Sequence, residues 1–245
     1  HAWDWYTGFI IWKTQNPWTA LRGQMYDYYL DVNACLYGLR NGSEPLHIMC
    51  NPVDGMAMIV NNTFHSYHDM MLKTSFIDLD GKEIPANDMI VEISPTSTQQ
   101  YFPLKRDMDK LRAKNGVFLK MQIVDAQQTV KSENIYWLPD STGNYSGLQH
   151  IMKANVIVTA RKVSSNTIEV KIANPSGNPL AFFNRVSLVD SATGKRVMPV
   201  FYDSNYVSVL PGSDKIIRLE YNGIVDGKVT VEGWNVPLQT IPVRN

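Results

Sequence analysis

After residue 31, apolar and polar residues alternate over short segments through most of this chain, as they do in half-buried β-strands. The alternation is most regular in the second half. Seven short strands are predicted there, at 155–160, 168–172, 180–189, 197–202, 206–210, 216–221 and 228–234. Turn-forming pairs such as Pro211-Gly212 and Asp226-Gly227 separate them. Short strands at this spacing over about 95 residues predict an immunoglobulin-like β-sandwich.

The stretch from about 45 to 138 fits the same class less regularly. Strands are predicted at 76–82, 89–93, 117–124 and 128–138, with a hairpin turn at Asp80-Gly81. The charged segment 104–114 suits either a short helix or an ordered loop. Residues 139–150 have the composition of a linker.

Residues 8–30 follow a different pattern. Residues 8–12 form a short apolar run, which suits a strand buried on both faces. Pro17 then stands where a helix could begin, and the next apolar residues are spaced three and four apart. These are Trp18, Leu21, Met25, Tyr28 and Tyr29. That spacing predicts one face of a helix, so the segment is expected to be a strand–loop–helix unit.

The predicted fold class is therefore all-β, with two immunoglobulin-like β-sandwich domains at 41–140 and 141–245. A strand–helix unit within residues 1–40 is expected to precede them. The chain opens on an aromatic run around Trp3 and Trp5, whereas chain termini are usually polar. We therefore expect these residues to be part of a longer protein.

Composition narrows the possible partners. The formal net charge is zero, which gives no electrostatic attraction to nucleic acid. No apolar run approaches the roughly 20 residues of a membrane-spanning helix, so neither nucleic acid nor membrane is an expected partner. Cys35 and Cys50 are too few for a disulfide framework or a zinc cluster. Free buried thiols and a single disulfide both remain open.

One string carries a specific resemblance. Residues 7–27, TGFIIWKTQNPWTALRGQMYD, resemble the last strand and helix of the (β/α)8 barrel in glycoside hydrolase family 2. Its endo-β-mannosidase members, which act on mannosylglycoproteins, are the most similar. Glu44-Pro45-Leu46-His47 is similar to the family's entry into its first C-terminal sandwich. Residues 174–212 resemble the terminal immunoglobulin-like domain of the family's exo-β-glucosaminidases.

The resemblance implies a retaining glycosidase that uses two glutamates, both on barrel strands upstream of this string. The glutamates of this chain all lie in or at the entry to the sandwich portion: Glu44, Glu83, Glu92, Glu133, Glu169, Glu220 and Glu232. No catalytic residue is therefore predicted here. The parent enzyme would hydrolyse β-mannosidic, or β-glucosaminidic or β-galactosidic, linkages, with the sandwiches bracing its barrel. A carbohydrate-binding module and a structural interaction domain are the alternatives.

Four residues near the end of the barrel string are candidates for substrate binding: Trp12, Gln15, Asn16 and Trp18. Barrel active sites lie at the carboxyl ends of strands, where a tryptophan ring can stack on a sugar and amides can bond its hydroxyls. Family members carry Asn-Asp or Asn-Asn where this chain has Gln15-Asn16, which leaves the sugar preference open. Packing within a barrel is the alternative role for Trp12 and Trp18.

No metal site and no cofactor are predicted. The segment from His65 to Asp69 offers metal-ligating side chains but lacks a third well-spaced ligand. The expected partners are carbohydrate, through the parent enzyme, and the upstream barrel of the same longer chain. The parent would be periplasmic or secreted if bacterial.

Overall fold

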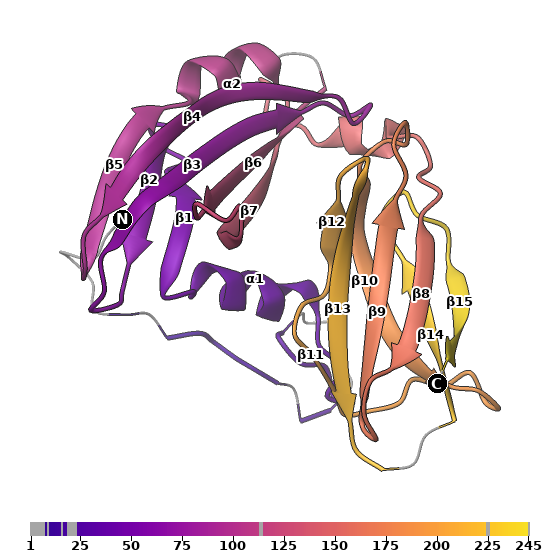
Figure 1. Cartoon of the computed structure of the whole chain (residues 1–245). Helices are drawn as coiled ribbons and strands as arrows, with labels where there is room; N and C mark the ends of the chain where they lie inside the picture. Colours follow the sequence, from indigo (N-terminus) through magenta and orange to yellow (C-terminus); the bar gives the residue numbers. More distant parts are fainter. Residues whose placement is uncertain are drawn as a thin grey trace. The chain divides into compact units, whose positions relative to one another are not determined.

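The computed structural model describes residues 8, 10–15, 17–18, 24–112, 115–223 and 226–244. The chain divides into two compact units: residues 1–10 with 39–151, and residues 11–38 with 152–245. Most regular structure in both is β-strand, as Figure 1 shows. This confirms the predicted all-β class. The predicted boundaries at 40 and 140 stay a prediction.

The first unit contains two antiparallel sheets. One has the order β1-β2-β5, from β1 (Leu46–Cys50), β2 (Met56–Asn61) and β5 (Ser97–Pro103). The other has the order β4-β3-β6-β7, from β3 (Tyr67–Ile77), β4 (Glu83–Ile93), β6 (Val117–Val124) and β7 (Val130–Leu138). The turn between β3 and β4 includes the predicted Asp80-Gly81 pair.

Side chains from both sheets form one core in this unit. Ile48, Ile59, Leu72, Phe76 and Leu119 are each at most 1% exposed. Burial of such side chains is the main favourable term in folding, at about 1.5–3 kcal/mol each. The undecided segment 104–114 contains the short helix α2 (Lys105–Leu111), which buries Met108. The linker-like stretch contains the 3-10 helix η1 (Ser146–His150).

The second unit is an eight-stranded sandwich with the order β11-β13-β9-β8-β15-β14-β10-β12. Its strands are β8 (Ile157–Lys162), β9 (Thr167–Asn174), β10 (Ala181–Asp190), β11 (Val200–Tyr202), β12 (Val207–Val209), β13 (Ser213–Tyr221), β14 (Gly227–Glu232) and β15 (Gln239–Arg244). The seven predicted strands are present. In Figure 1, β13, β9 and β8 lie in one layer, with β10, β14 and β15 behind them.

The eighth strand, β15, was not predicted from the sequence. It pairs antiparallel with β14 and parallel with β8. Its Pro242 is a residue that normally argues against a strand with neighbours on both sides.

Buried asparagines hold the irregular parts of this sandwich. Asn174 is 1% exposed and donates to the carbonyls of Pro179 and Val209, both at 2.9 Å. Asn235 donates to the carbonyls of Met152 and Leu180 and accepts from a backbone amide. These amides bond backbone carbonyls in loops and at the end of β12, where buried backbone groups need partners.

The predicted strand–helix unit at 8–30 is wrong where the structure describes it. The described residues 8 and 10–12 are not in a strand, and those at 17–18 and 24–33 are not helical. The side chain of Asp27 bonds the backbone amides of Tyr29 and Asp31, and this turn competes with a helix. An amphipathic helix gains most of its stability from packing of its apolar face. The first helix, α1, instead spans Ala34–Gly42.

Both cysteines are free, which settles the question left open by the sequence. Cys35 is exposed and Cys50 is buried. Burial, reinforced by the negative charge of Asp54, raises the pKa of the Cys50 thiol to about 11. Because the thiolate is the reactive form, Cys50 should be inert in the folded protein.

We predict that iodoacetamide at pH 8 alkylates Cys35 but not Cys50, and that both react once urea unfolds the chain. Mass spectrometry of tryptic peptides measures each site separately. Rapid labelling of Cys50 in the native protein would contradict its buried position.

We predict that Asn174→Ala destabilises the second sandwich by about 2–3 kcal/mol, because it leaves two buried carbonyls without donors. The matched control is Asn155→Ala, at an exposed asparagine of the same unit, which should change stability by less than about 0.5 kcal/mol. Urea denaturation of both variants measures the difference. Equal effects would show that the Asn174 bonds contribute nothing.

Candidate functional site

Three of the four predicted substrate-binding residues lie in the described part of the chain. Trp12 is 83% exposed and Trp18 is 63% exposed, so neither is used as a core residue here. Gln15 is exposed too, and its backbone pairs with Tyr26. Asn16 lies outside the described residues. The bond between Trp12 and Lys13 is a cis peptide.

Two β-bridges connect Gln15 to the chain further on. Gln15 pairs in parallel with Tyr26, whose amide donates to the Thr14 carbonyl at 2.9 Å. Tyr26 in turn pairs antiparallel with Val32. These bridges make a small ladder of three backbone segments, which we call the N-terminal ladder (Thr14–Gln15, Met25–Tyr26 and Val32–Asn33).

Asp27 shapes the turn that follows. Its Oδ1 accepts from the amides of Tyr29 at 2.8 Å and Asp31 at 2.9 Å. Leu30 has a φ of 68°, in the left-handed region that non-glycine residues rarely occupy. The turn reverses the chain, so that Val32 pairs antiparallel with Tyr26.

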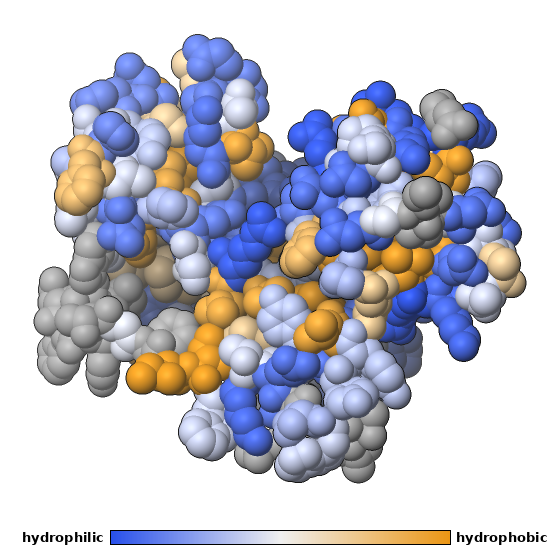
Figure 2. All heavy atoms as spheres, turned by 90° about the horizontal axis from the view of Figure 1, so that it is seen from below, coloured by the Kyte–Doolittle hydropathy of each residue, from blue (hydrophilic) through white to orange (hydrophobic). Residues whose placement is uncertain are grey.

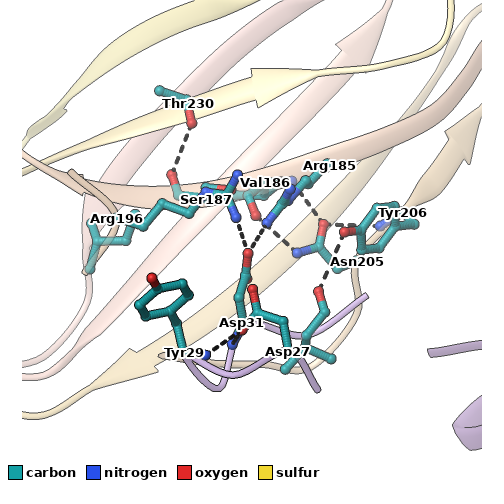
Figure 3. A network of polar contacts seen from close by, with 12 residues as sticks. Asp27, Tyr29, Asp31, Arg185, Val186, Ser187, Arg196, Asn205, Tyr206 and Thr230 are labelled. Atoms are coloured by element: carbon teal, nitrogen blue, oxygen red, sulfur yellow. Dashed lines mark hydrogen bonds and ion pairs between the residues drawn. The ribbon is translucent and has the colours of Figure 1, made fainter. Parts of the chain in front are cut away.

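The Asp31 carboxylate contacts two arginines of the second sandwich. Its Oδ2 lies 2.5 Å from Nη2 of Arg185, on β10, and is also bound by Nη1 of Arg196. Figure 3 shows the carboxylate between the two guanidinium groups. Asp31 is 21% exposed and Arg185 is 19% exposed. A charged pair this far removed from water gains more from its partner than a surface pair does. We call these three residues the Asp31 clamp.

Tyr206 contacts both Arg185 of the clamp and Val32, which follows Asp31. The Arg185 guanidinium lies 5.8 Å from the centre of the Tyr206 ring, within range of a cation–π contact. The Tyr206 hydroxyl donates to the Val32 carbonyl at 3.4 Å. Burial raises the pKa of Tyr206, and this effect exceeds the lowering by Arg185 and Arg196, so the phenol stays protonated as a donor.

Asn205 fixes the backbone beside this tyrosine. Its Oδ1 accepts from the amides of Val186 at 2.8 Å and Tyr206 at 2.9 Å, and its Nδ2 donates to the Val186 carbonyl. Tyr206 has a φ of 54°. The buried asparagine thus holds a strained residue in the position from which it reaches Val32.

A narrow hollow, with little more room than one water molecule needs, lies beside the clamp. It is lined by Leu30, Asp31, Val32, Ser187, Leu188, Arg196, Val197, Met198, Val200 and Tyr202. Apolar residues of the sandwich therefore lie beside residues 30–32, in addition to the polar contacts of Asp31.

The clamp was not predicted from the sequence. Asp31 and Arg185 are 154 residues apart, and Asp31 and Arg196 are 165 apart. No local spacing connects such residues, and an arginine on a strand is usually a solvated side chain.

Several of the glutamates bind neighbouring side chains on the sandwiches. Glu169 accepts from Arg161 at 2.7 Å and from Arg218 at 3.3 Å, and these arginines lower its pKa. Glu83 accepts from Ser75 at 2.5 Å. Glu133 accepts from Gln122 at 2.6 Å. These contacts are structural, since they join each glutamate to side chains of neighbouring strands.

The segment from His65 to Asp69 takes part in a chain of polar contacts. His68 Nδ1 lies 2.5 Å from Glu92, and Ser66 Oγ lies 2.9 Å from His68 Nε2. The Asp69 amide, followed by the His68 side chain, lowers the pKa of Glu92. The three side chains are exposed, so no closed site surrounds them. Within the described ranges, no cluster of three or more potential metal ligands occurs.

The surface also carries single large apolar side chains. In addition to Trp12 and Trp18, an aliphatic and an aromatic residue are almost fully exposed. Ile10 is 97% exposed and Phe64 is 91% exposed. Figure 2 shows apolar residues standing among polar ones on one face. Among the described helices, none has the length and apolar character needed to cross a membrane.

Two domain families match the chain. Residues 57–140 match the family described as "Mannosidase Ig/CBM-like domain". Residues 134–236 match "Exo-beta-D-glucosaminidase Ig-fold domain". The chain therefore carries immunoglobulin-like domains of exo-β-glucosaminidase and mannosidase type, as the resemblance in the sequence predicted.

Curated relatives agree with these matches. The chain is 29% identical to an exo-β-D-glucosaminidase of Amycolatopsis orientalis, over 96% of the chain and 25% of the relative. It is 27% identical to a mannosylglycoprotein endo-β-mannosidase of Lilium longiflorum, over 95% of the chain and 31% of that protein. The chain thus spans about a quarter to a third of the relatives it matches.

Solved structures share the fold. The exo-chitosanase of A. orientalis, in complex with PNP-β-D-glucosamine, matches with a TM-score of 0.80 and 26% identity, over 96% of this chain and 31% of that one. A β-D-mannosidase of Dictyoglomus thermophilum matches with a TM-score of 0.67 and 18% identity, over 92% of this chain and 26% of that one. These relatives are glycoside hydrolases, and the present chain corresponds to part of each.

Proposed function

We propose that this chain is the non-catalytic C-terminal part of a retaining β-glycosidase of glycoside hydrolase family 2. The parent hydrolyses β-mannosidic or β-glucosaminidic linkages, with β-galactosides as a further possible class. The observation that carries the proposal is the match over nearly the whole chain to about a quarter of an exo-β-D-glucosaminidase. The immunoglobulin-like domains brace the catalytic domain rather than react with substrate.

The distribution of carboxylates supports a non-catalytic role. A retaining enzyme needs two carboxyl groups about 5–5.5 Å apart at the sugar. No glutamate precedes Glu44 in this sequence. The glutamates that follow are on or beside sandwich strands, and Glu83, Glu133 and Glu169 are bonded to neighbouring side chains. The catalytic pair is thus assigned to the preceding part of the parent.

The exposed residues of the N-terminal ladder and its flanks are the part of this chain assigned to substrate. The Trp12 and Trp18 rings are open to contact, and a flat aromatic ring suits the C–H face of a sugar. Gln15 and Asn16 supply amides that can bond hydroxyl groups. In the parent, these four residues form one edge of the sugar-binding cleft.

A second candidate function is carbohydrate binding by the first unit alone. The matching family is described as CBM-like. Trp137 is 43% exposed and Tyr145 is 49% exposed, and both line one narrow hollow. That hollow is too tight to admit a water molecule, so a sugar would have to stack on the outside of the rings.

The experiment compares the isolated chain with a chimera, in which these 245 residues replace the part of the A. orientalis exo-β-D-glucosaminidase that they match. We expect the isolated chain to be inactive on PNP-β-D-glucosaminide, β-mannoside and β-galactoside, because it lacks the catalytic pair. We expect the chimera to hydrolyse the glucosaminide. Circular dichroism and thermal melting confirm that each protein is folded.

Hydrolysis by the isolated chain would overturn the proposal. A folded chimera without activity would contradict the bracing role. Isothermal titration of the isolated chain with manno- and glucosamine oligosaccharides tests the second candidate. Binding that Trp137→Ala abolishes, with Phe201→Ala at an exposed aromatic residue of the second unit as the matched control, would favour a carbohydrate-binding module.

A further inference from the structure

We propose that Asp31 is a positioning residue, which ties the substrate-facing segment around Trp12, Gln15 and Trp18 to the C-terminal sandwich through Arg185 and Arg196. The inference rests on the proposed function, because the proposed function assigns this segment to the sugar-binding edge. It goes further by naming the residues through which the C-terminal sandwich acts on substrate binding.

The contacts form a continuous path from sandwich to segment. Arg185 on β10 binds the Asp31 carboxylate at 2.5 Å. The adjacent Val32 pairs with Tyr26, and Tyr26 pairs with Gln15. The path thus consists of one ion pair, the peptide bond between Asp31 and Val32, and two β-bridges, which the hydrogen bonds from Tyr26 to Thr14 and from Asn33 to Met25 accompany.

Further contacts hold the N-terminal ladder in position around Val32. The Tyr206 hydroxyl donates to the Val32 carbonyl, and the Tyr206 ring lies 5.9 Å from that of Tyr37, just after the ladder. On the other side, Met25 is only 5% exposed, and its carbonyl accepts from the Asn33 amide at 3.2 Å. The ladder therefore has one buried side and one side that presents Gln15.

The clamp is the strongest of these contacts. Charge-assisted hydrogen bonds exceed neutral ones about twofold in strength. With a neutral side chain at position 31, two guanidinium groups would face each other without their shared anion.

The first test measures amide hydrogen exchange in the 245-residue chain. Asp31→Asn keeps the side-chain shape but removes the charge. We expect exchange at Tyr26 and Asn33 to rise about tenfold, because their bonds form only when the ladder is docked. Arg185→Lys keeps the charge without the planar fork and should give a smaller rise.

The matched control is Asp214→Asn. Asp214 pairs with Lys171 on strands of the same sandwich, and both side chains are about half exposed. This substitution should leave exchange at Tyr26 and Asn33 unchanged. Unaltered exchange in Asp31→Asn, or an equal rise in the control, would overturn the clamp.

The second test uses the chimera and separates positioning from general stability. If Trp12 and Gln15 bind sugar, Asp31→Asn should raise KM for PNP-β-D-glucosaminide about tenfold and change kcat by less than about twofold. Asp214→Asn should change neither constant. A loss of kcat at constant KM would mean that only the folded fraction fell, and would overturn the positioning role.

The two tests distinguish a failure of the proposed function from a failure of the Asp31 clamp. A chimera that is inactive before any substitution counts against the proposed function, while hydrogen exchange still decides whether the clamp holds the ladder. Faster exchange with unchanged KM supports the clamp as a contact but overturns its role in substrate binding.

Discussion

The carboxylate of Asp31 is the constraint on which the placement of the N-terminal segment depends. A charged group that is about four-fifths removed from solvent needs a partner of opposite charge, or its desolvation opposes folding. Arg185 and Arg196 supply two. Because both arginines belong to the C-terminal sandwich, the segment that includes Gln15 folds as part of that unit, although about 150 residues of chain lie between them.

The sandwich can provide this anchor because its own irregular parts are fixed from inside. Asn205 holds the strained backbone at Tyr206, and Tyr206 reaches the Val32 carbonyl. Asn174 and Asn235 likewise donate hydrogen bonds to backbone carbonyls of other irregular segments. Side-chain amides therefore replace ladder hydrogen bonds where strands end, and the apolar core supplies the remaining stability.

The sequence predicted strands whose burial alternates, such as β13, because one apolar face and one polar face leave a period of two. It missed β1 and β2, whose residues are nearly all buried and show no alternation, and β15, which contains Pro242. The expected helix is absent from its described residues 18 and 24–30, because spacing alone cannot weigh the competing turn at Asp27. Trp12 and Trp18 could be chosen as candidates from the barrel-like string. The clamp could not be predicted from the sequence, because it joins residues that lie more than 150 positions apart.

The most direct test of this account is a double-mutant cycle on Asp31 and Arg185 in the isolated chain. Asp31→Asn, Arg185→Met and the double variant are compared by urea denaturation, which does not screen charges as a salt does. The account predicts a coupling free energy above about 1 kcal/mol, larger than that of the exposed pair Lys171 and Asp214 measured in the same way. A coupling no larger than that of the exposed pair would show that the clamp does not hold the segment.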